Sequence, residues 1–418
     1  MPGSAVRRIA AWLRSARRVS AWIRLAAALM FVAAGVTVAA AEIAADAEAR
    51  PDRAGVPYPE VTPGFVPSFP RDHGAHPDFR TEWWYITGWL TDRNGAERGF
   101  QVTFFRVRPR IAEGGRSRFN PTQLVLAHAA VADASVGRLL HAERAERAQP
   151  PLVRAEIGHT AVQVRDWSLL WVDDELEVGG ASDGSASQQG PGGHYLARIA
   201  AGEFSFDLRI TPVGEPVLNG EGGYSRKAPS PEHASYYYSR PQLEVEGSLS
   251  LKNGSKPVSG KAWLDHEWSS EILPPGARGW DWIGINLHDG GSLMAFRMRG
   301  ADETPIWAAA TLRSPDGSIR ILQPDELRFI PQRHWRSPRS GATYTVEWTL
   351  QLAPLEGQAA RTLRIAPMMD DQELDSRRST GAIYWEGAVR LFEGEAHDEQ
   401  EIGKGYLEMT GYVERLSM

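Results

Sequence analysis

Cysteine is absent from the 418 residues of this chain. Disulfide bonds, thiolate metal sites and a cysteine nucleophile are therefore excluded. The Gly-x-Ser-x-Gly nucleophile elbow, the phosphate-binding loop and the dinucleotide fingerprint are also missing. Beyond residue 41, no stretch is apolar enough to cross a membrane, and no convincing amphipathic helical period is present. The function must therefore be sought in clusters that none of these motifs describes.

Positive charge is concentrated at the N-terminus. The formal net charge is −6, and residues 1–41 carry six arginines and no acid, so the remainder is more acidic than the whole chain. An acidic body repels a polyanion, which argues against nucleic acid as a partner.

Residues 1–41 have the layout of a secretory signal peptide. Residues 1–24 are basic, residues 25–40 carry no charge, and small residues close the segment at 38–41. The apolar run is short for a bilayer span, which needs roughly 20 residues. We therefore expect a periplasmic or secreted protein, with an uncleaved membrane anchor as the alternative. An extended, proline-rich lead-in is expected over residues 42–78.

Short alternating segments dominate the rest of the chain and predict an all-β fold. They are rich in β-branched and aromatic residues and are bounded by Gly, Pro, Asn or Asp. The predicted strands are residues 84–90, 99–107, 124–132, 204–210, 242–251, 282–287, 293–298, 344–352 and 383–391. Hairpin turn signals stand at 92–95, 253–254, 289–290 and 316–317. Glycine-containing loops are expected at 109–122 and 179–193, and short helical turns only near 141–148 and 370–378.

Paired aromatic residues followed by glycine recur in the chain, at 82–90, 280–287 and 383–391. Two related barrels would produce this echo, and chance similarity among strands is the alternative. The chain also holds 15 tryptophans. They indicate either aromatic-rich barrel cores or a cleft for an apolar or planar ligand.

The densest chemical cluster lies at residues 260–271. Asp265, His266 and Glu267 stand between Trp263 and Trp268. Strand alternation places Asp265 and Glu267 on one face and His266 and Trp268 on the other. One polar set must therefore find hydrogen-bond partners inside the protein. The cluster is either a polar strand end held by such a network or a general acid or base beside an aromatic wall.

A second cluster follows in Trp280, Asp281 and Trp282. A strand would place both tryptophans on one face and Asp281 on the other, and core packing is the alternative reading. Three consecutive tyrosines, residues 236–238, cannot all point into one core, so at least one lines a cleft or the surface. The same reasoning applies to the aromatic run at 82–85.

His73 and His76 lie in a segment rich in proline and glycine. Their spacing alone is a weak signal for a metal ion, and we expect no metal site.

These clusters together resemble the AttH-like, carotenoid 1,2-hydratase (hydroxyneurosporene synthase) family. The resemblance extends from about residue 79 to residue 415. The matching motifs are Glu82-Trp-Trp-Tyr-x-Thr-Gly88, Ala127-His128 with Asp133, Tyr237-Tyr238-Ser239, Gly260-x-x-Trp-x-Asp-His-Glu-Trp268, Gly279-Trp-Asp-Trp-x-Gly284, Leu293-Met294, Tyr384-Trp-Glu-Gly-Ala-Val389 and Gly403-x-Gly-Tyr-x-Glu-x-Thr-Gly-Tyr412.

The resemblance implies two consecutive lipocalin-like antiparallel β-barrels packed together, with a ligand cleft near their contact. We expect an N-terminal domain over residues 79–272 and a C-terminal domain over 273–418. Members of the family are described as hydratases or as secreted hydrolases. In the carotenoid hydratases a His-x-Trp pair and a downstream Tyr and Asp are implicated. His266 and Trp268 match the pair and Asp281 stands for the Asp, but Trp280 and Trp282 flank it where a tyrosine would be expected.

The resulting hypothesis is an exported enzyme that hydrates or hydrolyses an apolar isoprenoid or lipid substrate without metal or organic cofactor. Adding water to an alkene needs an acid, and tryptophan faces stabilise the resulting cation. Asp265 or Asp281 would supply the acid, with a pKa raised by an apolar surround, and His266 would orient it or act as base. The candidate catalytic residues are Asp265, His266, Asp281 and Glu267, and the candidate substrate-binding residues are Trp268, Trp280, Trp282, Trp84, Tyr237 and Tyr238.

The competing hypothesis is a periplasmic carrier of lipocalin type, which binds a lipid or isoprenoid without turnover. Such a ligand would also bring the protein into peripheral contact with a membrane. An envelope scaffold is a third class, because fold does not fix function. A deep cleft that meets Asp265, His266 and Asp281 would favour catalysis, and a closed barrel pocket far from them would favour carriage.

Overall fold

The computed structural model describes residues 57–110, 120–174, 192–354, 359–394 and 397–415. The expected signal peptide lies outside these residues, as do residues 42–56 of the lead-in and most of the two expected loops. Among the helices of the described residues, none has the length and apolar character needed to span a membrane.

Two antiparallel sheets make up nearly all of the regular secondary structure in the described residues, and one short 3₁₀ helix, η1 (Arg71–His73), precedes them. The first sheet has the order β4-β3-β2-β1-β13-β12-β9-β8-β7-β6-β5, with β10 and β11 paired to β12. Its strands are β1 (Thr81–Asp92), β2 (Glu97–Val107), β3 (Leu124–Asp133), β4 (Arg138–Arg147), β5 (Val153–Ala155), β6 (Ala161–Val164), β7 (Trp167–Asp173), β8 (Gly193–Ala200), β9 (Ser205–Thr211), β10 (Val217–Leu218), β11 (Tyr224–Arg226), β12 (Ala234–Leu251) and β13 (Gly254–Glu271).

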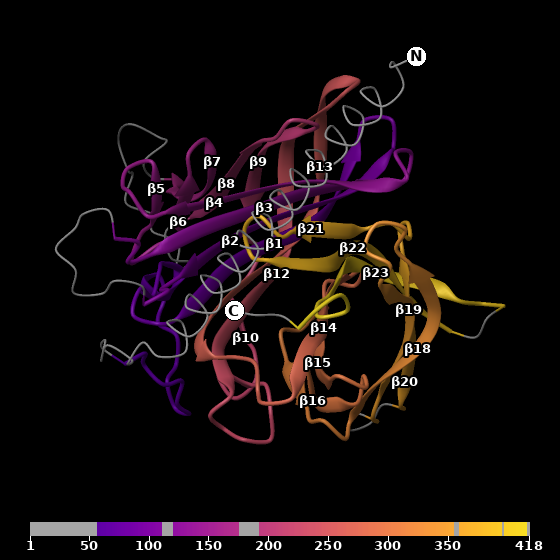
Figure 1. Cartoon of the computed structure of the whole chain (residues 1–418). Coiled ribbons are helices and arrows are strands. Elements are labelled where there is room, and N and C mark those ends of the chain that lie inside the picture. The colour runs from indigo at the N-terminus through magenta and orange to yellow at the C-terminus, as the bar shows by residue number, and fades with distance from the viewer. Residues whose placement is uncertain (1–56, 111–119, 175–191, 355–358, 395–396, 416–418) are drawn as a thin grey trace, which may run out of the picture. The chain divides into compact units, whose positions relative to one another are not determined.

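The second sheet has the order β17-β16-β15-β14-β23-β22-β20-β19-β18, with β21 paired to β22. Its strands are β14 (Ala277–Leu287), β15 (Ser292–Gly300), β16 (Pro305–Arg313), β17 (Ile319–Leu322), β18 (Leu327–Arg336), β19 (Thr343–Leu352), β20 (Arg361–Pro367), β21 (Glu373–Ser376), β22 (Ala382–Glu393) and β23 (Gln400–Met409). In Figure 1 these strands, coloured from salmon to yellow, curve round into a ring, and β16 meets β18 where the ring closes.

The all-β prediction is confirmed, because short segments of the sequence carry the strand patterns and turn signals themselves. All nine predicted strands fall on observed strands, and the four turn signals join β1 to β2, β12 to β13, β14 to β15 and β16 to β17. Gly95, Gly254, Gly290 and Gly317 occupy these turns with positive φ, a conformation that glycine adopts without steric cost. The predicted helical turns near 141–148 and 370–378 are wrong: these residues contribute to β4 and β21, because each segment pairs with a neighbouring strand.

Each sheet encloses its own apolar core, and a third cluster lies where the two sheets meet. This third cluster includes Tyr85 and Trp263 from the first sheet and Trp282 and Phe296 from the second. Hydrogen bonds also cross the contact: the Trp89 indole donates to the Gly405 carbonyl oxygen over 3.0 Å. The contact between the sheets is therefore an aromatic layer with polar groups inside it.

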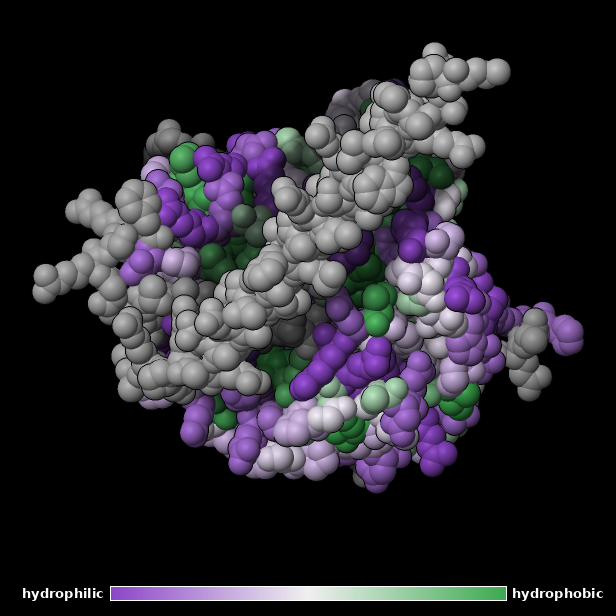
Figure 2. Space-filling model, viewed as in Figure 1, coloured by the Kyte–Doolittle hydropathy of each residue, from purple (hydrophilic) through white to green (hydrophobic). Residues whose placement is uncertain are grey.

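The outer surface is polar by comparison. Where Figure 2 colours the face in view, hydrophilic residues predominate and hydrophobic residues form small separate groups. The large apolar side chains that are exposed are scattered along the chain: Val66, Val136, Leu152, Ile157, Val213 and Ile319. Apolar surface is thus concentrated in the two cores and in the layer between the sheets.

In two of its three segments, 280–287 and 383–391, the echo of aromatic residues followed by glycine has a steric explanation. Trp282 and Gly284 share one face of β14, as Trp385 and Gly387 share one face of β22. A Cβ atom at either glycine would overlap the neighbouring tryptophan ring. The glycines therefore let each ring lie flat along its own strand.

Gly284→Ala should lower the free energy of unfolding by about 1–3 kcal/mol, because the methyl group must displace the Trp282 ring. Gly202→Ala is the matched control, since a Cβ there meets no atom within 4 Å. Denaturant titrations of both variants would measure the difference. Equal midpoints for the two variants would show that Trp282 has other room to occupy.

Candidate functional site

A cleft lies within the aromatic layer where the two sheets meet. β1, β2 and β13 line it from the first sheet, and β14, β15, β22 and β23 from the second. Its volume is about 60 Å³, so side chains must rearrange before a large ligand can enter. The lining residues are Trp83, Tyr85, Thr103, Phe105, Lys227, Asp265, Glu267, Ile272, Trp280, Trp282, Phe296, Met298, Tyr384 and Glu408.

Asp265 is the best-anchored acid of the cleft. Its Oδ1 atom accepts hydrogen bonds from Ser239 (2.6 Å) and from the Trp263 indole (2.7 Å), and Oδ2 accepts one from Tyr237 (2.8 Å). Burial raises the pKa of Asp265 to about 7, although the three donors act in the opposite direction. The Asp265 side chain therefore exchanges a proton near neutral pH.

Glu408 enters the same cleft from the second sheet. Burial raises its pKa to about 7 as well, opposed by one hydrogen bond of 2.8 Å from the Trp280 indole to Oε2. On the neighbouring strand, Glu386 stands directly opposite Glu408 in the register. Burial and the facing charge of Glu408 raise the pKa of Glu386 well above its ordinary value.

Glu267 and Lys227 form an ion pair at the edge of these acids. The Lys227 ammonium lies 2.8 Å from Glu267 Oε1, and Ser235 also donates to that oxygen. The Glu267 charge raises the pKa of both Asp265 and Glu408, as a smaller contribution than burial. The negative charge of Glu267 therefore helps to keep the pKa values of Asp265 and Glu408 near 7.

Aromatic rings form most of the remaining wall. Tyr85 and Trp282 meet edge to face at 5.2 Å, and the Trp282 indole donates to Tyr237 over 3.0 Å. The Tyr384 hydroxyl lies 2.7 Å from Nδ1 of His128, whose pKa burial lowers to about 3, so this imidazole is neutral. The cleft thus presents π faces, neutral polar groups and the Glu267–Lys227 ion pair around two titrating carboxyl groups.

The predicted site residues separate into three environments. Asp265, Glu267, Trp280 and Trp282 line the cleft, and Tyr237 reaches it through its hydrogen bond to Asp265.

The second environment is the interior of the first sheet. His266 lies on the opposite face of β13 from Asp265, as alternation predicts, and bonds to Glu82 (2.9 Å) and Tyr238 (3.1 Å). Trp84 and Trp268 pack against His266 there. His266, Trp84, Trp268 and Tyr238 are therefore not among the residues that line the cleft.

Asp281 occupies a third place, which differs from the apolar surround expected for it. Its carboxylate lies 2.6 Å from Arg297 Nε and 3.2 Å from Arg299 Nε, and accepts a hydrogen bond from Tyr412 (2.9 Å). The physical reason is alternation: Trp280 and Trp282 face the cleft, so Asp281 faces the opposite side of β14, where the arginines of β15 neutralise it. The structure does not bring Asp265 and Asp281 into one site.

Among the acidic and basic residues in or beside the cleft, the sequence reasoning missed Glu408, Glu386 and Lys227. Glu408 and Glu386 lie in motifs that were recognised, and each alternates with apolar residues that face the core, which was an available signal. Lys227 follows the short strand β11 in an irregular segment, where no pattern marked it.

A family model described as AttH-like matches residues 60–412. This chain belongs to the AttH-like family. The family resemblance inferred from the motifs is thereby confirmed, and no curated protein matches the chain.

Two solved structures are similar to this AttH-like chain. A protein from Nitrosomonas europaea described as an AttH shares 43% sequence identity with a TM-score of 0.72, over 85% of this chain and 100% of that one. Kievitone hydratase from Nectria haematococca shares 14% identity with a TM-score of 0.59, over 85% of this chain and 96% of that one. The latter similarity is one of fold. The AttH-like chain therefore has the lipocalin-like two-barrel architecture that the sequence predicted.

Proposed function

We propose that this protein is a hydratase that adds water across a carbon–carbon double bond of an apolar substrate held in the cleft. The supporting observation is a pair of carboxyl groups, Asp265 and Glu408, one from each sheet, whose pKa values are both raised to about 7 in an aromatic surround. General acid–base catalysis is most efficient when such values lie near the working pH.

The hydrogen bonds to the two carboxyl groups support a division of roles between them. Asp265 accepts three hydrogen bonds, which favour its charged form and leave one lone pair of Oδ2 for a water molecule. Glu408 accepts one hydrogen bond at Oε2, so the second oxygen can carry a proton towards the substrate. Glu408 is therefore the general acid and Asp265 the general base.

The reaction balances without a further reagent. Glu408 gives its proton to one alkene carbon, and the electron pair of the double bond forms the new C–H bond. Water held by Asp265 attacks the neighbouring cationic carbon, and Asp265 takes the proton that the oxygen loses. The product is an alcohol, and proton exchange with solvent restores both carboxyl groups.

Aromatic faces lower the cost of the cation. Trp83, Trp280, Trp282 and Phe296 line the cleft, and a desolvated cation over such a ring gains about 2 kcal/mol or more. An aromatic ring does not trap the cation as a free carboxylate would. The same apolar walls favour an isoprenoid or unsaturated lipid as substrate.

The rate of hydration should follow a bell-shaped pH profile with its maximum near pH 7. Below neutrality the base is lost as Asp265 is protonated, and above it the acid is lost as Glu408 ionises, because both pKa values are about 7. In Glu267→Gln both limbs should move to lower pH, since the charge that raises both values is gone. A profile that rises monotonically from pH 5 to 9 would contradict the assignment.

The function is tested with the full chain and a panel of isoprenoid and unsaturated lipid substrates in H₂¹⁸O. A product heavier by one labelled water, detected by mass spectrometry, is the expected result. Two fragments from one substrate would indicate hydrolysis instead. Retention of an unchanged lipid by the wild type and by an Asp265→Asn variant alike would replace the hydratase with a carrier.

We also propose that the protein acts outside the cytoplasm, on the strength of the basic and apolar leader of residues 1–41. Fractionation of cells that express the full chain tests this proposal. Recovery in the envelope or medium is expected, and recovery in the cytoplasm would overturn it.

A further inference from the structure

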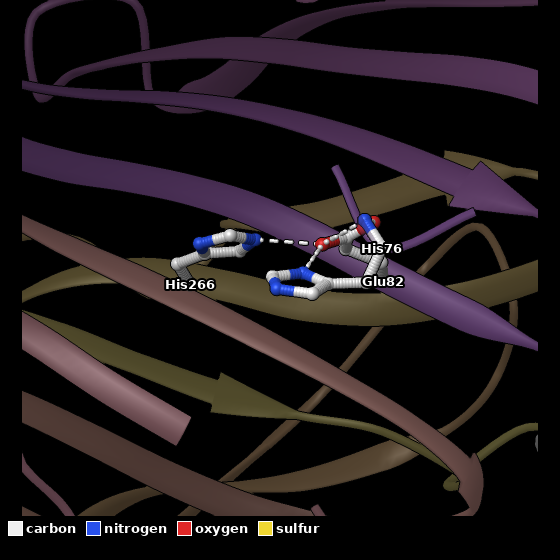
Figure 3. Close-up of side chains that lie close together, drawn as sticks. All are labelled: His76, Glu82 and His266. Atoms are coloured by element: carbon white, nitrogen blue, oxygen red, sulfur yellow. Dashed lines mark hydrogen bonds and ion pairs between the residues drawn. The ribbon is translucent and has the colours of Figure 1, made fainter. Parts of the chain in front are cut away.

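A second polar cluster lies on the opposite face of β13 from the cleft. It brings together His76 from the segment after η1, Glu82 from β1 and His266 from β13. Glu82 Oε1 lies 2.6 Å from His76 Nδ1 and 2.9 Å from His266 Nε2. Figure 3 shows the Glu82 carboxylate placed between the two imidazole rings.

The donor set is two imidazole nitrogens and one carboxylate oxygen. All three atoms lie within 4.8 Å of one another. This set is known from zinc enzymes and from non-haem iron sites, where further positions are left for water or ligand. Bond lengths of about 2.0–2.2 Å require roughly 3–3.5 Å between ligand atoms, so small side-chain shifts would admit an ion.

In each of the three side chains, the polar atom that would not bind the metal also has a hydrogen-bond partner. His76 Nε2 lies 3.3 Å from the Asp72 carboxylate, and His266 Nδ1 lies 3.1 Å from the Tyr238 hydroxyl. The second oxygen of Glu82 accepts a hydrogen bond of 2.8 Å from Arg106. Metal-bound histidines characteristically donate their other N–H to a carboxylate or another acceptor, which fixes the ring.

A hydrogen-bond chain supports the tautomer that a metal needs at His266. With Nε2 on a metal ion, Nδ1–H donates to Tyr238, and the Tyr238 hydroxyl then donates to Nδ1 of His73 at 2.8 Å. His73 can accept, because burial lowers its pKa to about 3 and the ring is neutral. Every hydrogen bond in this chain then has one donor and one acceptor.

Aromatic rings enclose the cluster. Trp268 stacks on His76 with ring centroids 3.9 Å apart, and Trp84 stacks on His266 at 4.7 Å. Within the described residues, the Trp268 indole N–H has no hydrogen-bond partner, so it is available to a further ligand. The His76 side chain is 15% exposed, which gives an ion a route from solvent.

We propose that His76, Glu82 and His266 bind a divalent first-row transition-metal ion, with Zn²⁺ or Fe²⁺ as the occupants that suit the donor set. His76 Nδ1, His266 Nε2 and Glu82 Oε1 supply the three protein ligands, and water fills the open positions. The ion would join the segment after η1 to β1 and β13. This site is independent of the hydratase cleft and differs from the sequence-based expectation that no metal is bound.

The proposal is tested by dialysing the full chain against Zn²⁺ and measuring bound metal by elemental analysis. One ion per chain is expected in the wild type. His76→Gln and His266→Gln should lose it, and Asp72→Asn should weaken binding by about 10- to 100-fold. Co²⁺ in place of Zn²⁺ should give a visible absorption spectrum typical of low coordination number.

His288→Gln is the matched control, because that imidazole is half exposed, pairs with Glu401 and lies outside the cluster. It should keep full binding. His76→Gln is the decisive variant if His266→Gln fails to fold, since His76 is the partly exposed ligand. Absence of stoichiometric Zn²⁺, or equal binding by His76→Gln and His288→Gln, would overturn the site.

Discussion

Glu408→Gln is expected to lower the rate of hydration by about 10²- to 10⁴-fold, the usual contribution of a general acid. Glutamine keeps the shape of the side chain and can still accept the hydrogen bond from Trp280, but it has no proton to give. Asp265→Asn should produce a loss of similar size, because an amide cannot take the proton from water. Rates measured with saturating substrate at pH 7 would give both values.

The control for this pair is Glu271→Gln at the exposed end of β13. It removes a carboxylate from the same strand and should leave the rate unchanged. Glu408→Gln should also unfold at or above the wild-type midpoint, because it removes a buried acid that costs free energy when ionised and keeps an acceptor for Trp280. Full turnover in Glu408→Gln would show that Glu408 is not the general acid.

Asp281→Asn is expected to lower the free energy of unfolding by about 3–5 kcal/mol. The substitution removes the charge that neutralises Arg297 and Arg299, whose side chains are 8% and 1% exposed. Arg299 also lies over the Tyr412 ring at 3.7 Å, so the cluster ties β15 to the last residues of the barrel. Unfolding of both proteins in guanidinium chloride measures the change, provided that the free energy of unfolding falls with denaturant at the same slope for both.

Asp325→Asn, an exposed aspartate in the same half of the chain, should be nearly neutral in the same titration. Turnover per folded molecule should be unaffected by Asp281→Asn at temperatures well below its unfolding transition. If the Asp281→Asn variant is as stable as the wild type but loses turnover, Asp281 takes part in the reaction.

The fold was predictable from local patterns. Period-two alternation, Asn-Gly and Asp-Gly turns and the family motifs each point to antiparallel strands. The two helical predictions failed because residues 138–147 and 373–376 are held as strands by pairing with β3 and β22, which is a tertiary effect. Local propensity does not contain that information.

The candidate site was predictable only in part. Alternation correctly placed Asp265 and Glu267 on one face of β13 and His266 on the other, but it could not say which face meets the second barrel. Asp281 and Glu408 lie on strands that pair with each other, yet their side chains point to opposite sides of the sheet. Convergence of Asp265 with Glu408 depends on the contact between sheets, 143 positions apart in sequence.

The hydrogen bond between the Trp282 indole and the Tyr237 hydroxyl crosses from one barrel to the other. A single barrel of this kind could bind a ligand in its interior, but it would contribute only one of the two titrating carboxyl groups. The acid–base pair proposed here therefore requires both barrels in one polypeptide, since Asp265 comes from the first sheet and Glu408 from the second. Under that proposal, activity depends on the faces of the barrels that meet, and the interiors of the barrels are left for other roles.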